Sequence, residues 1–239
     1  MEFQTPLVPA RLVRRYKRFL ADMVLEGGAE VTVHCPNPGA MTGLADPGAR
    51  CWLERAAPGR KLSFGWRLVD LPGGGMACVD TTLANRVVAE ALAAGCVVGL
   101  EGLSDLRAEV VLTPGTRVDF AATDRNGRRV FIEVKSVTLL RNGWAEFPDS
   151  VTARGQKHLR ELAAAVQDGA RAVMLYAMAR TDARRFRIAA DIDPGYASAF
   201  DAARAAGVEM LAQGAAITPR GITLDAPVPV DAGAQAPAA

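Results

Sequence analysis

Asp119, Glu133 and Lys135 have the side-chain types and the spacing that suit metal-assisted chemistry on a phosphate ester. Glu133 and Lys135 lie two positions apart in an apolar run, so in a strand both side chains project from the same face. A short hairpin would bring Asp119 onto the neighbouring strand. Two carboxylates on adjacent strands can share Mg²⁺ or Mn²⁺, which prefer oxygen ligands. Such an ion neutralises charge on the phosphoryl group and helps to generate hydroxide, while the Lys135 ammonium orients the water or stabilises charge.

Two other acids and a simpler interpretation have to be weighed beside this site. Glu90 lies before the strands and could add a third carboxylate, while Glu109, at the start of the first strand, competes for that role. The Glu-x-Lys spacing is also common on solvated strand faces, where it favours solubility. With Asp119 on the hairpin partner, a metal site is supported as well as a solvated strand face. The residues alone therefore leave both interpretations open.

The elements that must position these residues follow from the pattern of the second half of the chain. Apolar residues at helical spacing, closed by Gly95, predict a helix over residues 83–94 that carries Glu90. The nearly all-apolar run 171–178 predicts a strand that is buried on both faces and paired in parallel. The α-β-β-β-α-β order predicts an α/β fold with a mixed sheet. The other predicted elements are strands at 107–113, 117–122, 129–137 and 208–213, and helices at 152–167 and 196–205.

The first eighty residues have a different character. Short strand-like runs, among them 11–25 and 29–35, alternate with turn signals such as Pro-Gly pairs. About five antiparallel strands in this length predict a small closed barrel, which also removes exposed sheet edges. We therefore expect a barrel over residues 1–82 and an α/β domain over 83–225. Residues 226–239 are mostly Ala, Pro and Gly, and they predict a disordered tail.

Composition narrows the classes of function. The 239 residues carry a net charge of +2, so strong nucleic-acid binding has to come from local clusters of cations. No apolar run approaches the length of a membrane span, and the N-terminus lacks the pattern of a signal peptide. The four cysteines lack the close pairs of a zinc site. We expect a cytoplasmic protein with no membrane partner, and the sequence leaves open whether it forms a homodimer.

A basic segment lies near the start of the predicted barrel. It interleaves cations with two aromatic residues, which suits a groove that follows a nucleic-acid backbone and stacks bases. Strand alternation would place Arg14 with Arg18 on one face and Arg15 with Lys17 on the other. Such a segment can equally be a solvated face. The predicted DNA-binding cations here are Arg11, Arg14, Arg15, Lys17 and Arg18.

Two further segments could contact phosphates. Asn37 lies in a loop rich in turn formers at residues 35–43, where a tight turn is the first interpretation and phosphate contact the second. The predicted helix at 152–167 carries Arg154 and Lys157, which could meet phosphates. Its apolar residues are expected to face the sheet, and its cations can also simply be solvated.

Several motifs, in order along the chain, resemble the sugar fermentation stimulation protein family. They are CPNPGAMTG at residues 35–43, RVDF at 117–120, IEVKSVT at 132–138, FPD at 147–149 and TARGQKHLREL at 152–162. The resemblance spans roughly residues 1–224. One departure is Pro38, where many relatives carry Thr, and it removes a hydroxyl and a backbone donor from that position.

The resemblance implies an OB-like barrel followed by a nuclease-type domain of the PD-(D/E)xK kind. It places the nuclease signature on Asp119, Glu133 and Lys135, with Glu90 as the helix carboxylate. The helix equivalent to 152–167 often supplies a Gln or Lys to such sites, which makes Gln156 a predicted site residue. DNA binding without sequence preference is implied as well. We therefore expect a DNA phosphodiesterase that depends on Mg²⁺ or Mn²⁺. The alternative is a DNA-binding regulator of sugar, especially maltose, metabolism whose nuclease-like site is weak or unused.

Overall fold

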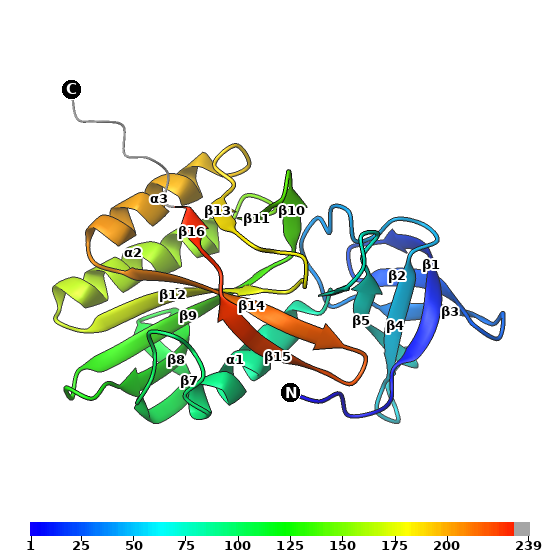
Figure 1. Cartoon of the computed structure of the whole chain (residues 1–239), viewed down its shortest axis with the longest axis horizontal. Coiled ribbons are helices and arrows are strands. Elements are labelled where there is room, and N and C mark those ends of the chain that lie inside the picture. The colour runs from blue at the N-terminus through cyan, green and yellow to red at the C-terminus, as the bar shows by residue number, and fades with distance from the viewer. Residues whose placement is uncertain (232–239) are drawn as a thin grey trace.

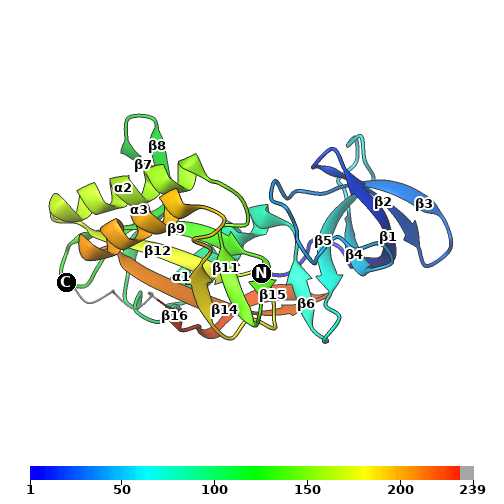
Figure 2. The same ribbon diagram turned by 90° about the horizontal axis from the view of Figure 1, so that it is seen from above.

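The computed structural model describes residues 1–231 and consists of two domains that lie side by side along the long axis (Figure 1). A small barrel built from the N-terminal strands stands at one end, and a larger α/β domain stands at the other (Figure 2). None of the helices within residues 1–231 has the length and apolar character needed to cross a bilayer.

The predicted barrel forms because apolar side chains alternate along its strands and point inward. Its strands are β1 (Val8–Tyr16), β2 (Leu20–Leu25), β3 (Glu30–His34), β4 (Arg50–Arg55), β5 (Phe64–Asp70) and β6 (Met76–Cys78). Their order is β3-β2-β1-β4-β5-β6, and a bridge between His34 and Gly65 joins β3 to β5 and closes the barrel. Leu12, Met23 and Trp66 fill the interior and are at most 2% exposed.

The predicted mixed sheet forms the centre of the second domain. Its strands are β7 (Ser104–Thr113), β8 (Thr116–Thr123), β9 (Arg129–Val137), β12 (Arg171–Met178), β14 (Glu209–Thr218) and β15 (Gly221–Pro227). They lie in the order β15-β14-β12-β9-β8-β7. β12 pairs in parallel with β9 and β14, as its apolar run predicted, while β8 is antiparallel to both neighbours.

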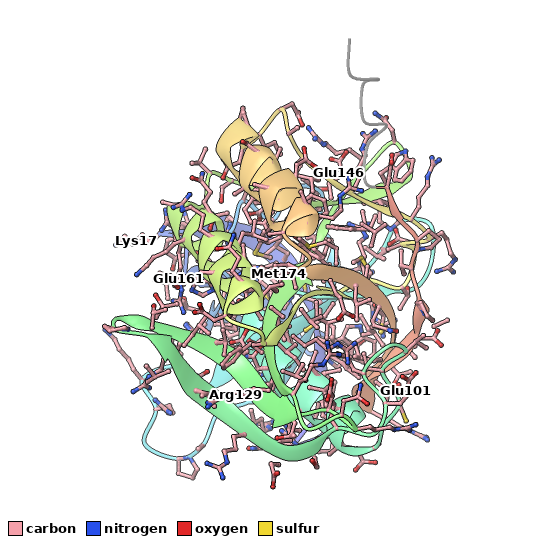
Figure 3. The ribbon with its side chains drawn as sticks, turned by 90° about the vertical axis from the view of Figure 1, so that its left-hand side faces the viewer. Lys17, Glu101, Arg129, Glu146, Glu161 and Met174 are labelled. Carbon is pink, nitrogen blue, oxygen red and sulfur yellow. The ribbon has the colours of Figure 1, made fainter. Side chains whose placement is uncertain are left out.

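Helices cover both faces of this sheet. They are α1 (Ala84–Ala93), which follows the 3-10 helix η1 (Thr81–Leu83), and α2 (Ala153–Gln167) and α3 (Pro194–Ala205). α2 and α3 lie together on one face, with Met174 of β12 beneath them in the core (Figure 3). α1 packs on the opposite face against a second cluster that includes Ile132 and Val173. The two layers of helix fix which side chains of β9 point to which side.

A smaller, four-stranded sheet was not predicted. Its strands are β10 (Leu139–Arg141), β11 (Trp144–Phe147), β13 (Phe186–Ile188) and β16 (Val230–Asp231), in that order. Strands this short show no usable periodicity. β16 also corrects the predicted tail. Val228 is 8% exposed and β16 pairs with β13, so residues 226–231 pack on the domain. The remainder of the predicted tail, 232–239, lies outside the described residues.

The basic segment of the barrel is the end of one strand and the turn that leads into the next. β1 ends at Tyr16 and β2 begins at Leu20, and between them Lys17 and Arg18 have φ values of 47° and 62°. The prediction that Arg14 and Arg18 share one strand face is therefore wrong. The turn contains no Gly, Pro or Asn, so no residue in it signalled a break in the strand.

Within residues 1–231, hydrogen bonds join the barrel to the α/β domain at three separate places. β6 pairs with the segment after β12, where the N–H of Cys78 donates to the carbonyl of Ala179. The backbone of Met1 exchanges hydrogen bonds with β15. In the third contact, the N–H of Ala40 donates to Oδ2 of Asp149 over 2.9 Å.

Candidate active site

The predicted carboxylates lie at the point where β8 and β9 separate, which we call the fork. The ladder between these strands stops at the pair Phe120–Ile132. Asp119 and Glu133 are the next residues beyond that pair, one on each strand. The backbone N–H of Val134, which meets no β8 carbonyl here, donates instead to Oδ2 of Asp119 over 2.7 Å. The fork therefore replaces a backbone pairing with a side-chain contact, and it brings the two acids to one place.

Glu133 has one engaged carboxylate oxygen and one that has no partner. Oε1 accepts a hydrogen bond from Nζ of Lys135 over 2.6 Å and contacts Nδ1 of His158. Oε2 is buried and has no hydrogen-bond partner among residues 1–231. Burial alone would raise the pKa of Glu133, but the His158 hydrogen bond and the Lys135 charge outweigh it and lower this pKa. Glu133 is therefore ionised at neutral pH.

Asp119 faces the same fork from β8. Its Oδ1 accepts a hydrogen bond of 2.7 Å from Nδ2 of Asn85, at the start of α1. Burial, and after it the charge of Glu133, raise the pKa of Asp119. The two carboxylates are therefore close enough to repel each other, and a bound cation would relieve that repulsion. Asn85 had no signal in the sequence, because an Asn near the start of a helix is more simply explained by capping.

α2 supplies a histidine to the site in place of the predicted glutamine. The buried residues of α2 follow a stripe of i, i+3, i+4 and i+7, and His158 lies within that stripe. Gln156 is two positions earlier, about 200° around the helix. Its Nε2 donates to Oδ1 of Asp193 over 3.0 Å, next to α3, so the prediction for Gln156 is corrected. A polar residue inside an apolar helical stripe was the signal that could have identified His158.

The other predicted acids point elsewhere. The Glu90 side chain is 52% exposed and pairs with the amino group of Met1 at 2.8 Å. α1 presents Asn85 to the fork, and Glu90, five residues later, lies about 140° around the helix from it. Glu109, on the edge strand β7, lines a neighbouring recess beside α2. Within residues 1–231, no three His, Cys, Asp or Glu side chains are grouped as a metal site, so the fork offers two carboxylates.

A cleft of about 660 Å³ opens over the fork, and both domains line it. The α/β domain contributes Asp119, Glu133 and Lys135 from its strands and Arg154 from α2. The barrel contributes Arg18 from the β1–β2 turn and part of the loop at residues 37–39. Cations from two domains therefore flank the carboxylates, which favours an anionic ligand such as a phosphodiester.

The barrel loop at this cleft is held by hydrogen bonds within the protein. Asn37 is 1% exposed, and its Oδ1 accepts from the N–H of Gly39 over 2.8 Å while its Nδ2 donates to the carbonyl of Val79. Arg15 donates to the carbonyl oxygens of Asn37 and Gly39. The tight-turn interpretation of Asn37 fits these contacts. Asn37 and Arg15, both predicted to contact DNA, thus hold the loop in place.

The remaining predicted DNA-binding cations differ in whether their side chains already have partners within the protein. Arg11 and Arg14 are exposed on β1, but Arg11 bonds a backbone carbonyl and Arg14 pairs with a carboxylate on β2. Lys17 and Arg18 are exposed in the turn, and of these Arg18 lines the cleft. Lys157 lies on the outer side of α2, in the recess next to the cleft. Arg18 and Arg154 are therefore the cations that reach both the solvent and the site.

The donor atoms at the fork fit a hard divalent cation. Two oxygen donors lie at one cleft. They are the carboxylate of Asp119 and Oε2 of Glu133, which is buried and has no partner in the described part of the chain. Mg²⁺ is commonly held by one or two carboxylates, with water and phosphate oxygens as the other ligands, and Mn²⁺ has similar preferences. The residues present therefore fit the ion that the sequence implied.

Comparison with known proteins agrees with this architecture. Residues 13–79 match the SfsA N-terminal OB domain, and residues 82–221 match the sugar fermentation stimulation protein RE domain. Sugar fermentation stimulation protein homologs from Dinoroseobacter shibae and Jannaschia sp. are 58% and 56% identical over 99% of this chain, and the matches cover 98% and 99% of those proteins.

A solved structure extends the match to three dimensions. Pyrococcus furiosus SfsA, in complex with Ca²⁺, is 26% identical and superposes with a TM-score of 0.87, over 97% of this chain and 98% of that one. The family and the two-domain fold expected from the motifs are confirmed. The chain belongs to the sugar fermentation stimulation protein family, with an N-terminal OB barrel and a restriction-endonuclease-like α/β domain.

Proposed function

We propose that this protein is a divalent-metal-dependent DNA phosphodiesterase that binds DNA without sequence preference. The observation that carries the proposal is the pair of carboxylates at the β8–β9 fork. Asp119 and Glu133 share a cleft with Lys135, and Glu133 keeps a buried oxygen that has no partner within residues 1–231. A purely structural pair of acids would be expected to have its buried oxygens satisfied.

The residues have distinct roles in this proposal. Asp119 and Glu133 would hold Mg²⁺ or Mn²⁺, which supplies charge neutralisation at the phosphate and an acidified water. Lys135 donates hydrogen bonds toward charge that develops in the cleft. Arg18 and Arg154 contact the phosphates on either side of the reacting one. The Ca²⁺ complex of the Pyrococcus furiosus relative supports a divalent-ion site, since Ca²⁺ also takes oxygen ligands.

A second function is favoured by one observation at the same site. Lys135 and His158 both contact Oε1 of Glu133, so this carboxylate already has compensating partners without an ion. Such a site could be kept for its fold alone. The protein would then be a DNA-binding regulator that does not cut, and the cleft cations would serve binding only.

Cleavage assays on purified protein separate the two functions. Single- and double-stranded DNA of several sequences are incubated with Mg²⁺, Mn²⁺ or chelator. The proposal expects cutting that requires metal and is lost in Asp119→Asn and Glu133→Gln. Glu90→Gln and Glu109→Gln make the same chemical change outside the fork and are expected to retain cutting. Equal activity in all four variants would trace the cutting to a contaminant. Salt-sensitive binding without cutting would establish the regulator instead.

A further inference from the structure

His158 is the one buried histidine of the described chain and is 4% exposed. It lies in the apolar stripe of α2, among residues that pack against the sheet. A histidine at such a position is usually a satisfied core residue. Here both ring nitrogens face polar groups, and one of these groups is Glu133 of the fork.

The hydrogen bonds of the ring define which nitrogen carries the proton. Nε of Arg154 donates to Nε2 of His158 over 3.4 Å, so Nε2 acts as the acceptor. Nδ1 is then the protonated nitrogen and donates to Oε1 of Glu133. A ring that carries its proton on Nδ1 satisfies both contacts. Arg154, which also lines the cleft, holds the far side of the ring in place.

This contact determines how the Glu133 carboxylate is turned. Oε1 is contacted by Lys135 and by His158. Oε2 stays buried at the cleft and has no partner among the residues that the structure describes. With Lys135 alone, the carboxylate could rotate to share both oxygens with the ammonium. Nδ1–H of His158 prevents this because it holds Oε1 from the side of α2. Partners of this kind orient metal-binding groups in many proteins.

We propose that His158 is a positioning residue that orients Glu133 so that Oε2 is presented to a divalent cation. The inference rests on the proposed function only in assuming that the fork binds a metal ion. Its effect is on the affinity for the ion, so it can be measured in the absence of DNA. Cutting is a second and separate readout.

The test is Mn²⁺ affinity, measured by calorimetry on the full chain. His158→Leu keeps most of the volume and removes the donor, and it should weaken Mn²⁺ binding about 10–100-fold. His158→Asn places an amide donor near the position of Nδ1 and should bind within about threefold of the parent protein. His34→Ala removes the exposed histidine of β3 and is the matched control. Equal affinities for the Leu and Asn variants would overturn the proposal.

A measurement on the unmodified protein does not depend on how the variants fold. ¹⁵N NMR of labelled histidine distinguishes the two neutral tautomers, and His158 should carry its proton on Nδ1. The Nε2–H tautomer would overturn the proposal. If the parent protein binds Mn²⁺ through the fork but cuts no DNA, the proposed function fails while the role of His158 stands. If Glu133→Gln leaves Mn²⁺ binding unchanged, both fail.

Discussion

The two walls of the cleft are built in different ways. The α/β wall presents charged groups on strands and on a helix. Its two acids lie close together, and the buried Glu133 keeps one oxygen that has no partner among the described residues. The barrel wall presents a loop whose polar groups are bonded to one another, with Asn37, Gly39 and Arg15 linked through the turn. Arg18 is a charged barrel side chain that both lines the cleft and is exposed to solvent.

This difference suggests a division of work. Unsatisfied and mutually repelling groups cost stability, and proteins keep them where chemistry needs them. A loop whose hydrogen bonds are satisfied has no such cost in stability, and it keeps the shape of the cleft wall. We infer that residues of the α/β wall carry out the chemistry and that the barrel wall positions the ligand. Each of the following changes would break or sharpen that comparison.

The largest effect is expected for Lys135→Ala. Nζ of Lys135 lies beside Glu133 and at the cleft, where it can stabilise developing charge. The kcat for DNA cutting should fall about 10²–10³-fold with little change in KM. Lys17→Ala removes a lysine from the barrel turn and should leave kcat within about threefold of the parent value. Similar losses in the two variants would break the comparison.

A smaller effect is expected where the walls touch. A methyl group on Gly39 would lie 2.1 Å from Oδ2 of Asp149 and push aside the carboxylate that accepts from Ala40. Gly39→Ala should lower kcat/KM about tenfold through misplacement of the barrel. Gly27→Ala, at an open position of the barrel, is the matched control. The double variant with Asp149→Ala should be no worse than Asp149→Ala alone, and additive losses would show that the contact is unimportant.

Binding should change more modestly, and only for cations that are free. Arg18→Ala should weaken DNA binding a few-fold and reduce the slope of log K against log salt by about one. Arg14→Ala should leave the slope unchanged, because Arg14 is already paired with a carboxylate of β2. Fluorescence anisotropy titrations at several salt concentrations measure both slopes. An equal decrease for Arg14→Ala would place the outer face of β1 in the interface as well.

The smallest effect concerns stability in chelator. The pKa of Asp119 is raised by burial and by Glu133, so the folded state binds this proton more tightly than the unfolded state does. The ionised carboxylate therefore costs stability at neutral pH, and Asp119→Asn should raise Tm by about 1–4 °C. The gain should vanish as the pH falls below the usual range of an aspartate, because both states then hold the proton. Calorimetric scans from pH 3 to pH 8 follow this trend, and a destabilised variant at pH 8 would contradict it.

The sequence predicted the strand-borne part of the site because strands have a simple geometry. A period of two places Glu133 and Lys135 on one face, and a hairpin makes Asp119 a neighbour, so local spacing was sufficient. The parallel pairing of β12 also followed from a local property, its unbroken apolar run. The motifs then identified the family and both domains.

The helix-borne and turn-borne parts could not be predicted in the same way. Which face of α1 meets the fork depends on tertiary packing, so Glu90 and Asn85 could not be ranked from spacing. Gln156 was expected from the resemblance, while His158 was visible as a polar residue in an apolar stripe. Arg18 reaches the cleft because its turn adopts left-handed backbone conformations. This turn contains no Gly or Pro that would have indicated it in the sequence. Such turns are set by the barrel around them.

The three contacts between the barrel and the α/β domain have a mechanical consequence. A body joined to another at one point can swing, and a body joined at two can still rotate about the line between them. The backbone pairing of β6, the pairing of Met1 with β15 and the Ala40–Asp149 bond together remove that remaining freedom. The width of the cleft is therefore fixed, and a ligand has to adapt its own shape in order to enter it.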